Sequence, residues 1–438
     1  MTVTGAIAAL ASAAEVPGLP LRRGGRVMAF DGSTIEALGI DAAIGSRGLI
    51  GPQRQAAELI GFRDGRALFM GLSPLAGVVP GALVLPDDDA GTIACGNGVL
   101  GRVIDAMGRP LDGRGPIVAA TMRPASPAML GPADRLRVTR PLATGVRAID
   151  GLLSFGIGQR IGIMAGTGVG KSVLLGQITR WASADIVIMA LIGERGREIT
   201  DFIETELVGP ARARTIVVAV PASDAPLLRV RGAMRAFAMA EHFRDGGSQV
   251  LLILDSLSRV VHGAREVALA RGENAGGRGY PPSSLALIAG LAERAGGDRR
   301  SGGAITLVAT VLAESDDRAD PVVDAARGVM DGHVLLSRKL AGRGQYPAID
   351  LAASASRVMA DVVSTEHLVA AARFRRLSSL IDDNRDLVLM GAYAPGSDAE
   401  LDTALALAPR LEAWRSQPRH SAAAWDDSAA SLVALVAP

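Results

Sequence analysis

The stretch Arg160-Ile-Gly-Ile-Met-Ala-Gly-Thr-Gly-Val-Gly-Lys-Ser172 decides the fold of this chain. It begins with a short apolar run, which predicts a buried strand, and continues through a glycine-rich turn into a helix that starts near Lys171. Such glycines let backbone N–H groups point inward around a phosphate, and the helix N-terminus adds a positive dipole end. We therefore predict a phosphate-binding loop for a nucleotide, in which Lys171 reaches the β- and γ-phosphates and the Ser172 hydroxyl ligates Mg²⁺. The other residues predicted to bind the nucleotide here are Gly166, Thr167, Gly168, Val169, Gly170 and Val173.

Two further motifs carry carboxylates. Val250-Leu-Leu-Ile-Leu-Asp255 is an apolar run that ends in Asp, and beside a phosphate loop this predicts that Asp255 holds Mg²⁺ through water. Leu191-Ile-Gly-Glu-Arg-Gly-Arg-Glu198 follows another apolar run, and we expect Glu194 to orient and polarise the attacking water. Glu198, one helical turn later, is expected in the outer shell of the metal. By spacing alone, a solvated charged loop is an equal alternative for this motif.

The surrounding pattern predicts an α/β fold with a parallel sheet. Apolar runs over 160–165, 185–193, 215–220, 250–255 and 304–311 alternate with helical patterns, as in a parallel sheet covered on both faces. Between residues 22 and 100 turn signals recur about every ten residues, which indicates a small β-barrel or sandwich. We expect an N-terminal arm over 1–21, a β-barrel domain over 22–100, an ATPase domain over 101–365 and a C-terminal helical domain over 366–438.

Composition narrows the functional classes. The 46 Lys and Arg residues balance 45 Asp and Glu residues, so no electrostatic footprint for nucleic acid is present. Because Cys95 is the single cysteine, the chain can form no intrachain disulfide, which favours a reducing compartment. Cys95 itself is expected to be a packing residue. No apolar run is long enough to span a bilayer, and no basic residue precedes the apolar segment over 6–14, so we expect a cytoplasmic location.

At its motifs the chain resembles the rotary and secretion ATPases related to the F-type ATP synthase β subunit. Within that group it most resembles the flagellar export ATPases and the type III secretion ATPases, over about residues 100–402. In this export branch the first position of the phosphate loop is usually Ala, as Ala165 is here. Six further stretches carry the resemblance: Leu100-Gly-Arg-Val-Ile-Asp-Ala-Met-Gly-Arg-Pro-Leu-Asp-Gly113, Thr144-Gly-Val-Arg-Ala-Ile-Asp150, Asp255-Ser-Leu-Ser-Arg259, Arg278-Gly-Tyr-Pro-Pro-Ser283, Asp331-Gly-His-Val-Leu-Leu-Ser-Arg338 and Pro347-Ala-Ile-Asp-Leu-Ala-Ala-Ser-Ala-Ser356.

The resemblance implies a fold and further site residues. The implied fold is a RecA-like P-loop core, preceded by a small N-terminal β-barrel and followed by a C-terminal helical domain. Glu194 resembles the catalytic carboxylate and Arg195 its catalytic neighbour, while Arg259 resembles the arginine near the γ-phosphate. Tyr346 resembles the aromatic residue that packs on adenine, although a half-buried packing role stays open. Arg357 resembles the arginine finger supplied in trans to the neighbouring subunit, with an ordinary surface arginine as the alternative.

The resemblance also implies a function and partners. It implies a Mg²⁺-dependent ATPase that forms a homohexamer and couples ATP hydrolysis to chaperone release, unfolding and export of flagellar proteins. The implied partners are a stator-like regulator on the N-terminal arm, a coiled-coil central stalk protein, the export gate at the membrane, and export chaperones with their substrates. The implied location is the cytoplasm, peripherally associated with the inner membrane at the export apparatus. Ile7 and Leu10 would share one helix face of the arm, which suits docking on a partner helix; a disordered tail is the alternative.

Three rival functions share some of these motifs. The injectisome type III secretion ATPase has the same chemistry in a different machine. A catalytic rotary ATP synthase subunit needs an alternating non-catalytic partner, whereas one chain that carries both Glu194 and Arg357 suits a homohexamer. A nucleic-acid motor of the Rho type is disfavoured by the balanced charge and by the 3% content of aromatic residues. The chain departs from the family pattern over 273–278 and at Leu285, in a loop that faces the central pore in relatives.

Overall fold

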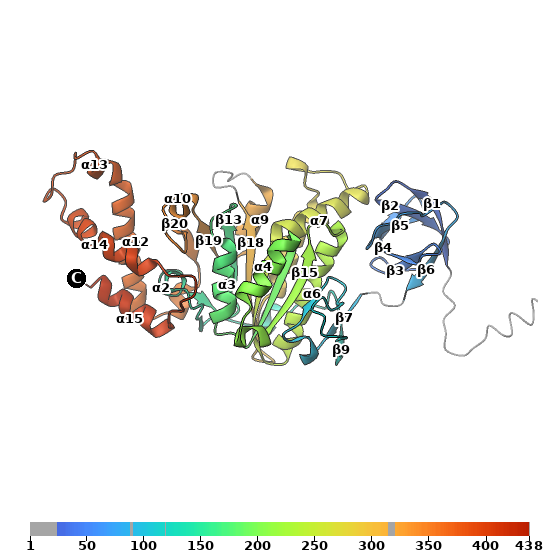
Figure 1. The fold of residues 1–438 in the computed structure, drawn as a ribbon, viewed down its shortest axis with the longest axis horizontal. Coiled ribbons are helices and arrows are strands. Elements are labelled where there is room, and N and C mark those ends of the chain that lie inside the picture. The colour runs from blue at the N-terminus through green and yellow to red at the C-terminus, as the bar shows by residue number, and fades with distance from the viewer. Residues whose placement is uncertain (1–23, 88–90, 119, 314–319, 438) are drawn as a thin grey trace, which may run out of the picture. The chain divides into compact units, whose positions relative to one another are not determined.

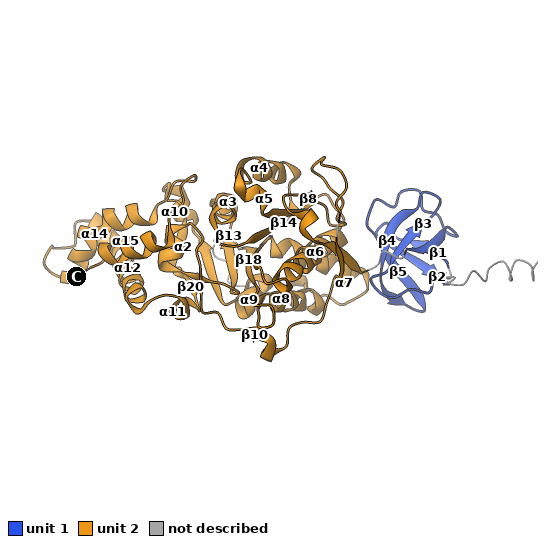
Figure 2. Cartoon of the chain, turned by 90° about the horizontal axis from the view of Figure 1, so that it is seen from below, with its two compact units in different colours: residues 1–90 blue, residues 91–438 orange. Residues whose placement is uncertain are grey.

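The computed structural model describes residues 24–87, 91–118, 120–313 and 320–437. The chain divides into two compact units, residues 1–90 and residues 91–438 (Figure 2). The predicted N-terminal arm, residues 1–21, lies outside the described residues. Within the described ranges, no helix is both long and apolar enough to cross a membrane.

The first unit is a closed six-stranded barrel (Figure 1). Its strands are β1 Gly25–Phe30, β2 Thr34–Leu38, β3 Arg47–Ile50, β4 Gln55–Arg63, β5 Arg66–Gly71 and β6 Leu83–Asp87, in the order β1-β2-β5-β4-β3-β6. Asp64 and Gly65, both at positive φ, form the two-residue turn between β4 and β5 that twisted antiparallel strands favour. Inward-facing side chains such as Ile35, Leu59 and Phe69 are fully buried and fill the interior. A barrel, rather than a sandwich, is therefore the correct interpretation of this segment.

The centre of the second unit is a mostly parallel sheet in the order β20-β19-β13-β18-β16-β14-β15-β8. The five predicted strands are all present in it, and their mutual pairing is parallel. Along this order, the edge strand β20 pairs antiparallel with β19, and a short strand outside the order, β17 Gly296–Asp298, pairs antiparallel with β18. The bounds are β8 Val103–Ile104, β13 Arg160–Ala165, β14 Ile186–Glu194, β15 Thr215–Pro221, β16 Gln249–Asp255, β18 Ala304–Leu312, β19 Gly332–Leu336 and β20 Ile349–Ser356.

Helices cover both faces of this sheet. Alternate residues of each strand face opposite ways, so each strand contributes side chains to the contacts on both faces. Met189 and Leu191 of β14 belong to the apolar core that also contains residues of α3 Lys171–Trp181 and α4 Gly196–Glu206. Ile192 and Val220 lie against Gly232 of α6 Pro226–Asp245 on the other face. The remaining helices of this domain are α2 Arg147–Leu152, α5 Pro210–Ala213, α7 Leu257–Ala270, α8 Pro282–Arg294, α9 Pro321–Val329, α10 Arg338–Gly342 and α11 Met359–Val362.

Short strand pairs organise the segment that follows the barrel, and one of them, β10 with β17, joins it to the core sheet through β18. They are β7 Thr92–Cys95 with β9 Thr121–Pro124, β10 Arg135–Leu136 with β17 Gly296–Asp298, and β11 Pro141–Leu142 with β12 Phe155–Gly156. Cys95 is fully buried here, and burial raises the pKa of its thiol to about 11. This agrees with a packing role rather than a reactive thiol.

The chain ends in a helical domain that packs on the core through α2. Its helices are α12 Thr365–Asp383, α13 Arg385–Leu389, α14 Ala399–Arg415 and α15 Trp425–Leu435. The Trp414 ring lies over Gly151 of α2, where a Cβ atom would come within 2.5 Å of the ring. His367 Nε2 hydrogen-bonds to the carbonyl oxygen of Gly151 at 2.8 Å. The predicted order of barrel, α/β core and helical domain is confirmed (Figure 1).

Candidate active site

The glycine-rich loop lies between β13 and α3, where the sequence predicts it. Gly168 and Gly170 have φ values of 75° and 86°, a backbone conformation that only glycine adopts at little cost. Helix α3 begins at Lys171, and Ser172 is exposed in its first turn. Val169 is buried and anchors the loop, whereas Thr167 and Gly168 are exposed at its tip. The loop therefore presents backbone N–H groups and a helix N-terminus to the same space, as phosphate binding requires.

A compact charge cluster lies at the start of α3. Lys171 Nζ donates to Glu194 Oε1 at 3.1 Å and to Asp255 Oδ1 at 2.5 Å. Thr310 Oγ1, from the end of β18, donates to the same Asp255 oxygen at 2.6 Å. Burial by itself would lower the pKa of Lys171, but the charges of Asp255 and Glu194 outweigh burial and raise the pKa above its ordinary value. The lysine is therefore held protonated between the two carboxylates that the sequence singled out.

This convergence follows from the sheet topology. Strands β13, β16 and β14 run parallel, so their carboxyl ends meet at one edge of the sheet. Asp255 ends β16 and Glu194 ends β14, while Lys171 follows the loop after β13. Thr310 joins them from β18, which lies between β13 and β16, and the sequence analysis did not identify it. An open parallel sheet places ligands at this edge.

The arginines predicted near Glu194 lie in different environments. Arg259, in the first turn of α7, packs over Gly193, where a Cβ atom would come within 2.7 Å of the arginine Cβ. The Arg259 Nε atom is buried and has no hydrogen-bond partner among the described residues. Arg195 and Glu198 point to solvent and contact each other, with Nη1 of Arg195 3.4 Å from Oε1 of Glu198. The structure thus places Arg259 against Gly193, the residue before Glu194, whereas the recorded ion-pair partner of Glu198 is Arg195 rather than a member of the charge cluster.

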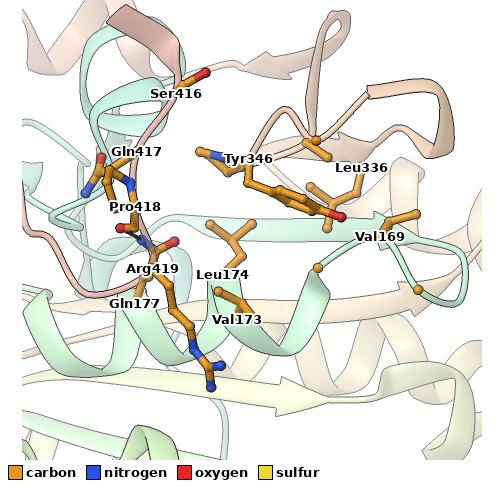
Figure 3. Close-up of a pocket in the computed structure, with 15 residues that line it drawn as sticks. Val169, Val173, Leu174, Gln177, Leu336, Tyr346, Ser416, Gln417, Pro418 and Arg419 are labelled. Carbon is orange, nitrogen blue, oxygen red and sulfur yellow. Dashed lines mark hydrogen bonds between the residues drawn. The ribbon is translucent and has the colours of Figure 1, made fainter. Parts of the chain in front are cut away.

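A cavity of about 630 Å³ opens beside the phosphate loop (Figure 3). The Tyr346 ring lies against Gly170, with ring carbons 3.1–3.2 Å from where a glycine Cβ would stand, and Tyr346 itself is 42% exposed. Val173 and Leu174 of α3 form part of the cavity wall, and Leu336 lies near Tyr346 (Figure 3). A mostly apolar cavity with one exposed aromatic face has the shape and chemistry that a nucleotide base requires.

The opposite wall of this cavity comes from a segment that the sequence analysis missed. Ser416, Gln417, Pro418 and Arg419 connect α14 to α15 and face Tyr346 across the hollow (Figure 3). The Gln417 backbone N–H donates to the Tyr346 carbonyl oxygen at 2.9 Å, which joins the two walls. In the sequence, Pro418 signals no more than a break between two helices.

Arg357 follows β20, the edge strand of the sheet, and is exposed. Its backbone N–H donates to the Asp331 carbonyl oxygen at 2.9 Å, and its guanidinium contacts the Arg327 carbonyl oxygen at 3.5 Å. Neither contact is with the phosphate loop of the same chain. An exposed arginine at a sheet edge is free to meet another molecule.

The oxygen ligands at this site suit Mg²⁺, which binds through few protein ligands and keeps water and phosphate oxygens in its octahedron. The Ser172 hydroxyl and the Asp255 carboxylate are hard oxygen donors at one end of the sheet. No group of three or more His, Cys, Asp or Glu side chains with metal-binding geometry occurs among the described residues. A cation that relies on phosphate oxygens does not require such a group.

Comparison with protein-family models gives two matches. Residues 145–356 match the nucleotide-binding domain of the ATP synthase alpha/beta family. Residues 363–434 match the C-terminal domain of the type III secretion ATPase EscN.

Individual relatives match almost the whole chain. The flagellum-specific ATP synthase of Pseudomonas aeruginosa is 46% identical over 97% of this chain and 95% of the relative. That of Salmonella typhimurium is 45% identical over 94% of this chain and 93% of the relative, and the type 3 secretion system ATPase of Xanthomonas euvesicatoria is 39% identical over 94% of each. Among solved structures, the assembled ATPase EscN of enteropathogenic E. coli superposes with a TM-score of 0.90 at 38% identity, covering 94% of this chain and 100% of EscN.

Proposed function

This chain belongs to the family of flagellum-specific ATP synthases and type III secretion ATPases, and we propose that it hydrolyses ATP with Mg²⁺ to drive the export of flagellar proteins. One observation carries the chemical part: Lys171 is held between Glu194 and Asp255 at the start of the helix that follows the phosphate loop. The same arrangement opens onto a cavity that fits a base.

In the proposed reaction Lys171 exchanges its carboxylate partners for the β- and γ-phosphates of ATP. Glu194, relieved of the lysine, then accepts a hydrogen bond from the attacking water and aligns it with the γ-phosphorus. Arg259 packs against Gly193, the residue before Glu194, and we propose that its buried Nε supplies a donor near the γ-phosphate. Arg195 is a flanking cation on the exposed side.

The rest of the nucleotide occupies the loop and the cavity. Backbone N–H groups over 166–173 cradle the phosphates, and Tyr346 stacks on the base. Ser172 and Asp255 would hold Mg²⁺, which supplies positive charge to the phosphates when bound. We propose Glu198 for the outer shell only, since it lies apart from the charge cluster and contacts Arg195.

We further propose that the chain works as a homohexamer. Arg357 is exposed at the edge strand and is directed to no group of its own phosphate loop, which suits a finger that completes the neighbour's site. The relative EscN has been solved as an assembled ATPase and also in complex with its central stalk EscO. We propose an equivalent ring and coiled-coil stalk here, together with the N-terminal regulator, export gate, chaperones and substrates that the family implies. The proposed place of work is the cytoplasmic face of the inner membrane.

The flagellar assignment rests on similarity. The relatives at 46% and 45% identity are flagellum-specific enzymes, whereas the type 3 secretion relative of Xanthomonas is 39% identical. An injectisome ATPase with the same chemistry is the second candidate, favoured by the likeness to EscN.

Replacement of Lys171 by alanine tests the chemistry. Removing the ammonium group that faces the transferred phosphoryl group is expected to abolish ATP turnover, measured as phosphate release. The chain offers a matched control, because Lys339, exposed on α10, is its other lysine. The Lys339→Ala variant is expected to hydrolyse ATP at the wild-type rate. Wild-type turnover by Lys171→Ala would overturn the proposed function.

A further inference from the structure

A buried carboxylate, that of Glu206, links the wall of the base cavity to α3, the helix that follows the phosphate loop. Glu206 is the last residue of α4. Its side chain is 3% exposed and accepts hydrogen bonds from Arg180 of α3 and from Arg419 of the cavity wall. The Arg180 side chain is 8% exposed and that of Arg419 is 44% exposed. The Arg419 Nε also donates to Glu206 Oε1, at 3.1 Å. We call Arg180, Glu206 and Arg419 the ion triad.

The triad has a specific steric requirement. Gly176, in the middle of α3, leaves the space that the Glu206 carboxylate fills: a Cβ atom there would stand 2.1 Å from Oε2. The Arg180 guanidinium is stacked on the Trp181 ring, 4.7 Å from its centroid, and so is fixed on its other side. A carboxylate this deeply buried is retained only when it is paired and hydrogen-bonded.

The triad is one of several anchors of the segment 417–419. The Gln417 side chain is held separately, because its Oε1 accepts from the Arg147 backbone N–H at 2.8 Å and its Nε2 donates to the Gly145 carbonyl oxygen at 2.8 Å. The Arg180 Nη2 atom donates to the Arg419 carbonyl oxygen at 2.9 Å, and Gln177 Nε2 donates to the Pro418 carbonyl oxygen at 3.2 Å. Residues 417–419 are therefore bound from below by α3 and α4, and from across the cavity by the backbone of Tyr346. The segment has no regular secondary structure of its own, so the bonds from α3 and α4 fix its end at Pro418 and Arg419.

Helix α4 connects the triad to the reaction centre. It begins at Gly196, two residues after Glu194, and ends at Glu206. One rigid helix therefore spans from the candidate catalytic carboxylate to the residue that holds the cavity wall. At roughly 1.5 Å per residue, its 11 residues span about 16 Å.

We propose that Glu206 is a positioning residue for nucleotide binding: through Arg419 it places the 418–419 end of the second wall of the base cavity. The inference deepens the proposed function and rests on it. Glu206 acts through Arg419 and touches no nucleotide. Loss of either partner releases this end of the wall while Gln417 keeps its bonds, so ATP binding weakens and the phosphate loop and charge cluster stay intact.

The experiment compares Glu206→Gln, Arg419→Ala and the double variant in steady-state ATP hydrolysis and in binding of a fluorescent ADP analogue. We expect KM and Kd to rise by about tenfold in each single variant, a typical size for the loss of one buried coupled contact. The double variant is expected to match the single variants, because both changes break the same link. The value of kcat at saturating ATP is expected to change by less than about threefold.

A second buried ion pair supplies the control. Glu241 of α6 and Arg294 of α8 pair at 2.7 Å with side chains 4% and 6% exposed, and neither lines the base cavity. Both Glu206→Gln and Glu241→Gln are expected to lower the melting temperature, since each leaves a buried arginine without its partner charge. Only Glu206→Gln is expected to raise KM.

The outcomes separate this inference from the function on which it rests. An unchanged KM in Glu206→Gln overturns the positioning role. If KM rises in Arg419→Ala but not in Glu206→Gln, Arg419 contacts the nucleotide without help from Glu206. An equal rise of KM in Glu241→Gln would reduce the effect to general destabilisation and also overturns the positioning role. If the wild-type chain fails to hydrolyse ATP, the proposed function itself fails.

Discussion

Glu194→Gln separates catalysis from binding at the charge cluster. In the structure Glu194 accepts one hydrogen bond from Lys171 at 3.1 Å, and a glutamine carbonyl oxygen can accept the same bond. The substitution keeps the size of the side chain and removes one negative charge. Asp255, 2.5 Å from the ammonium group and bonded to Thr310, still holds Lys171 in place.

The expected magnitudes follow from these contacts. A neutral amide cannot polarise the attacking water, so kcat should fall by roughly 10²- to 10⁴-fold, the range for loss of a positioned general base. That fall corresponds to about 3–5 kcal/mol in the activation barrier. Stability should change by only about 1 kcal/mol, because a charge-assisted bond becomes a neutral one and no partner is orphaned. Binding of ATP should be unchanged or tighter, since Lys171 loses one of the two carboxylates that compete with phosphate.

The assay is phosphate release under saturating ATP, paired with calorimetric titration of a non-hydrolysable ATP analogue. Asp255→Asn is the informative comparison, because that carboxylate is expected to serve both Lys171 and Mg²⁺ and its loss should weaken binding as well as turnover. Glu194→Gln turning over at the wild-type rate would show that another group orients the water. Loss of nucleotide binding in Glu194→Gln would mean that the glutamate shapes the site rather than acting on water.

Two further predictions concern assembly and the N-terminus. Arg357→Ala should bind ATP yet turn over roughly 10³-fold more slowly, and mixing it with Lys171→Ala should restore some activity if subunits exchange, as native mass spectrometry can verify. No recovery in freely exchanging rings, together with a nucleotide-bound structure in which Arg357 lies away from the neighbour's γ-phosphate, would refute a finger in trans. Deletion of residues 2–18 should abolish capture of the stator-like regulator in a pull-down and leave the folded core intact by circular dichroism. Retained capture would place the regulator's binding site elsewhere.

The local sequence was sufficient for the phosphate-binding end of the site. Gly168, Gly170 and Lys171 are neighbours in the chain, and the loop conformation follows from the freedom of glycine and the start of α3. Asp255 and Glu194 could be anticipated because each ends an apolar run, and parallel strands present their carboxyl ends at one edge. The alternation of strands and helices likewise sufficed for the parallel sheet, whereas the regular turn signals between residues 22 and 100 left a barrel and a sandwich both open until the structure showed a closed barrel.

Only the tertiary structure decided how the base cavity is closed. Tyr346 and the wall over 416–419 are far apart in the chain, and a segment without periodicity carries no signal of what it faces. Glu206 reads in the sequence as one more polar residue at a helix end, yet folding buries it between Arg180 and Arg419. Short-range patterns specify elements and the chemistry at their ends, because those depend on neighbouring residues. Contacts between distant segments depend on how whole elements pack, and that information is spread over the entire chain.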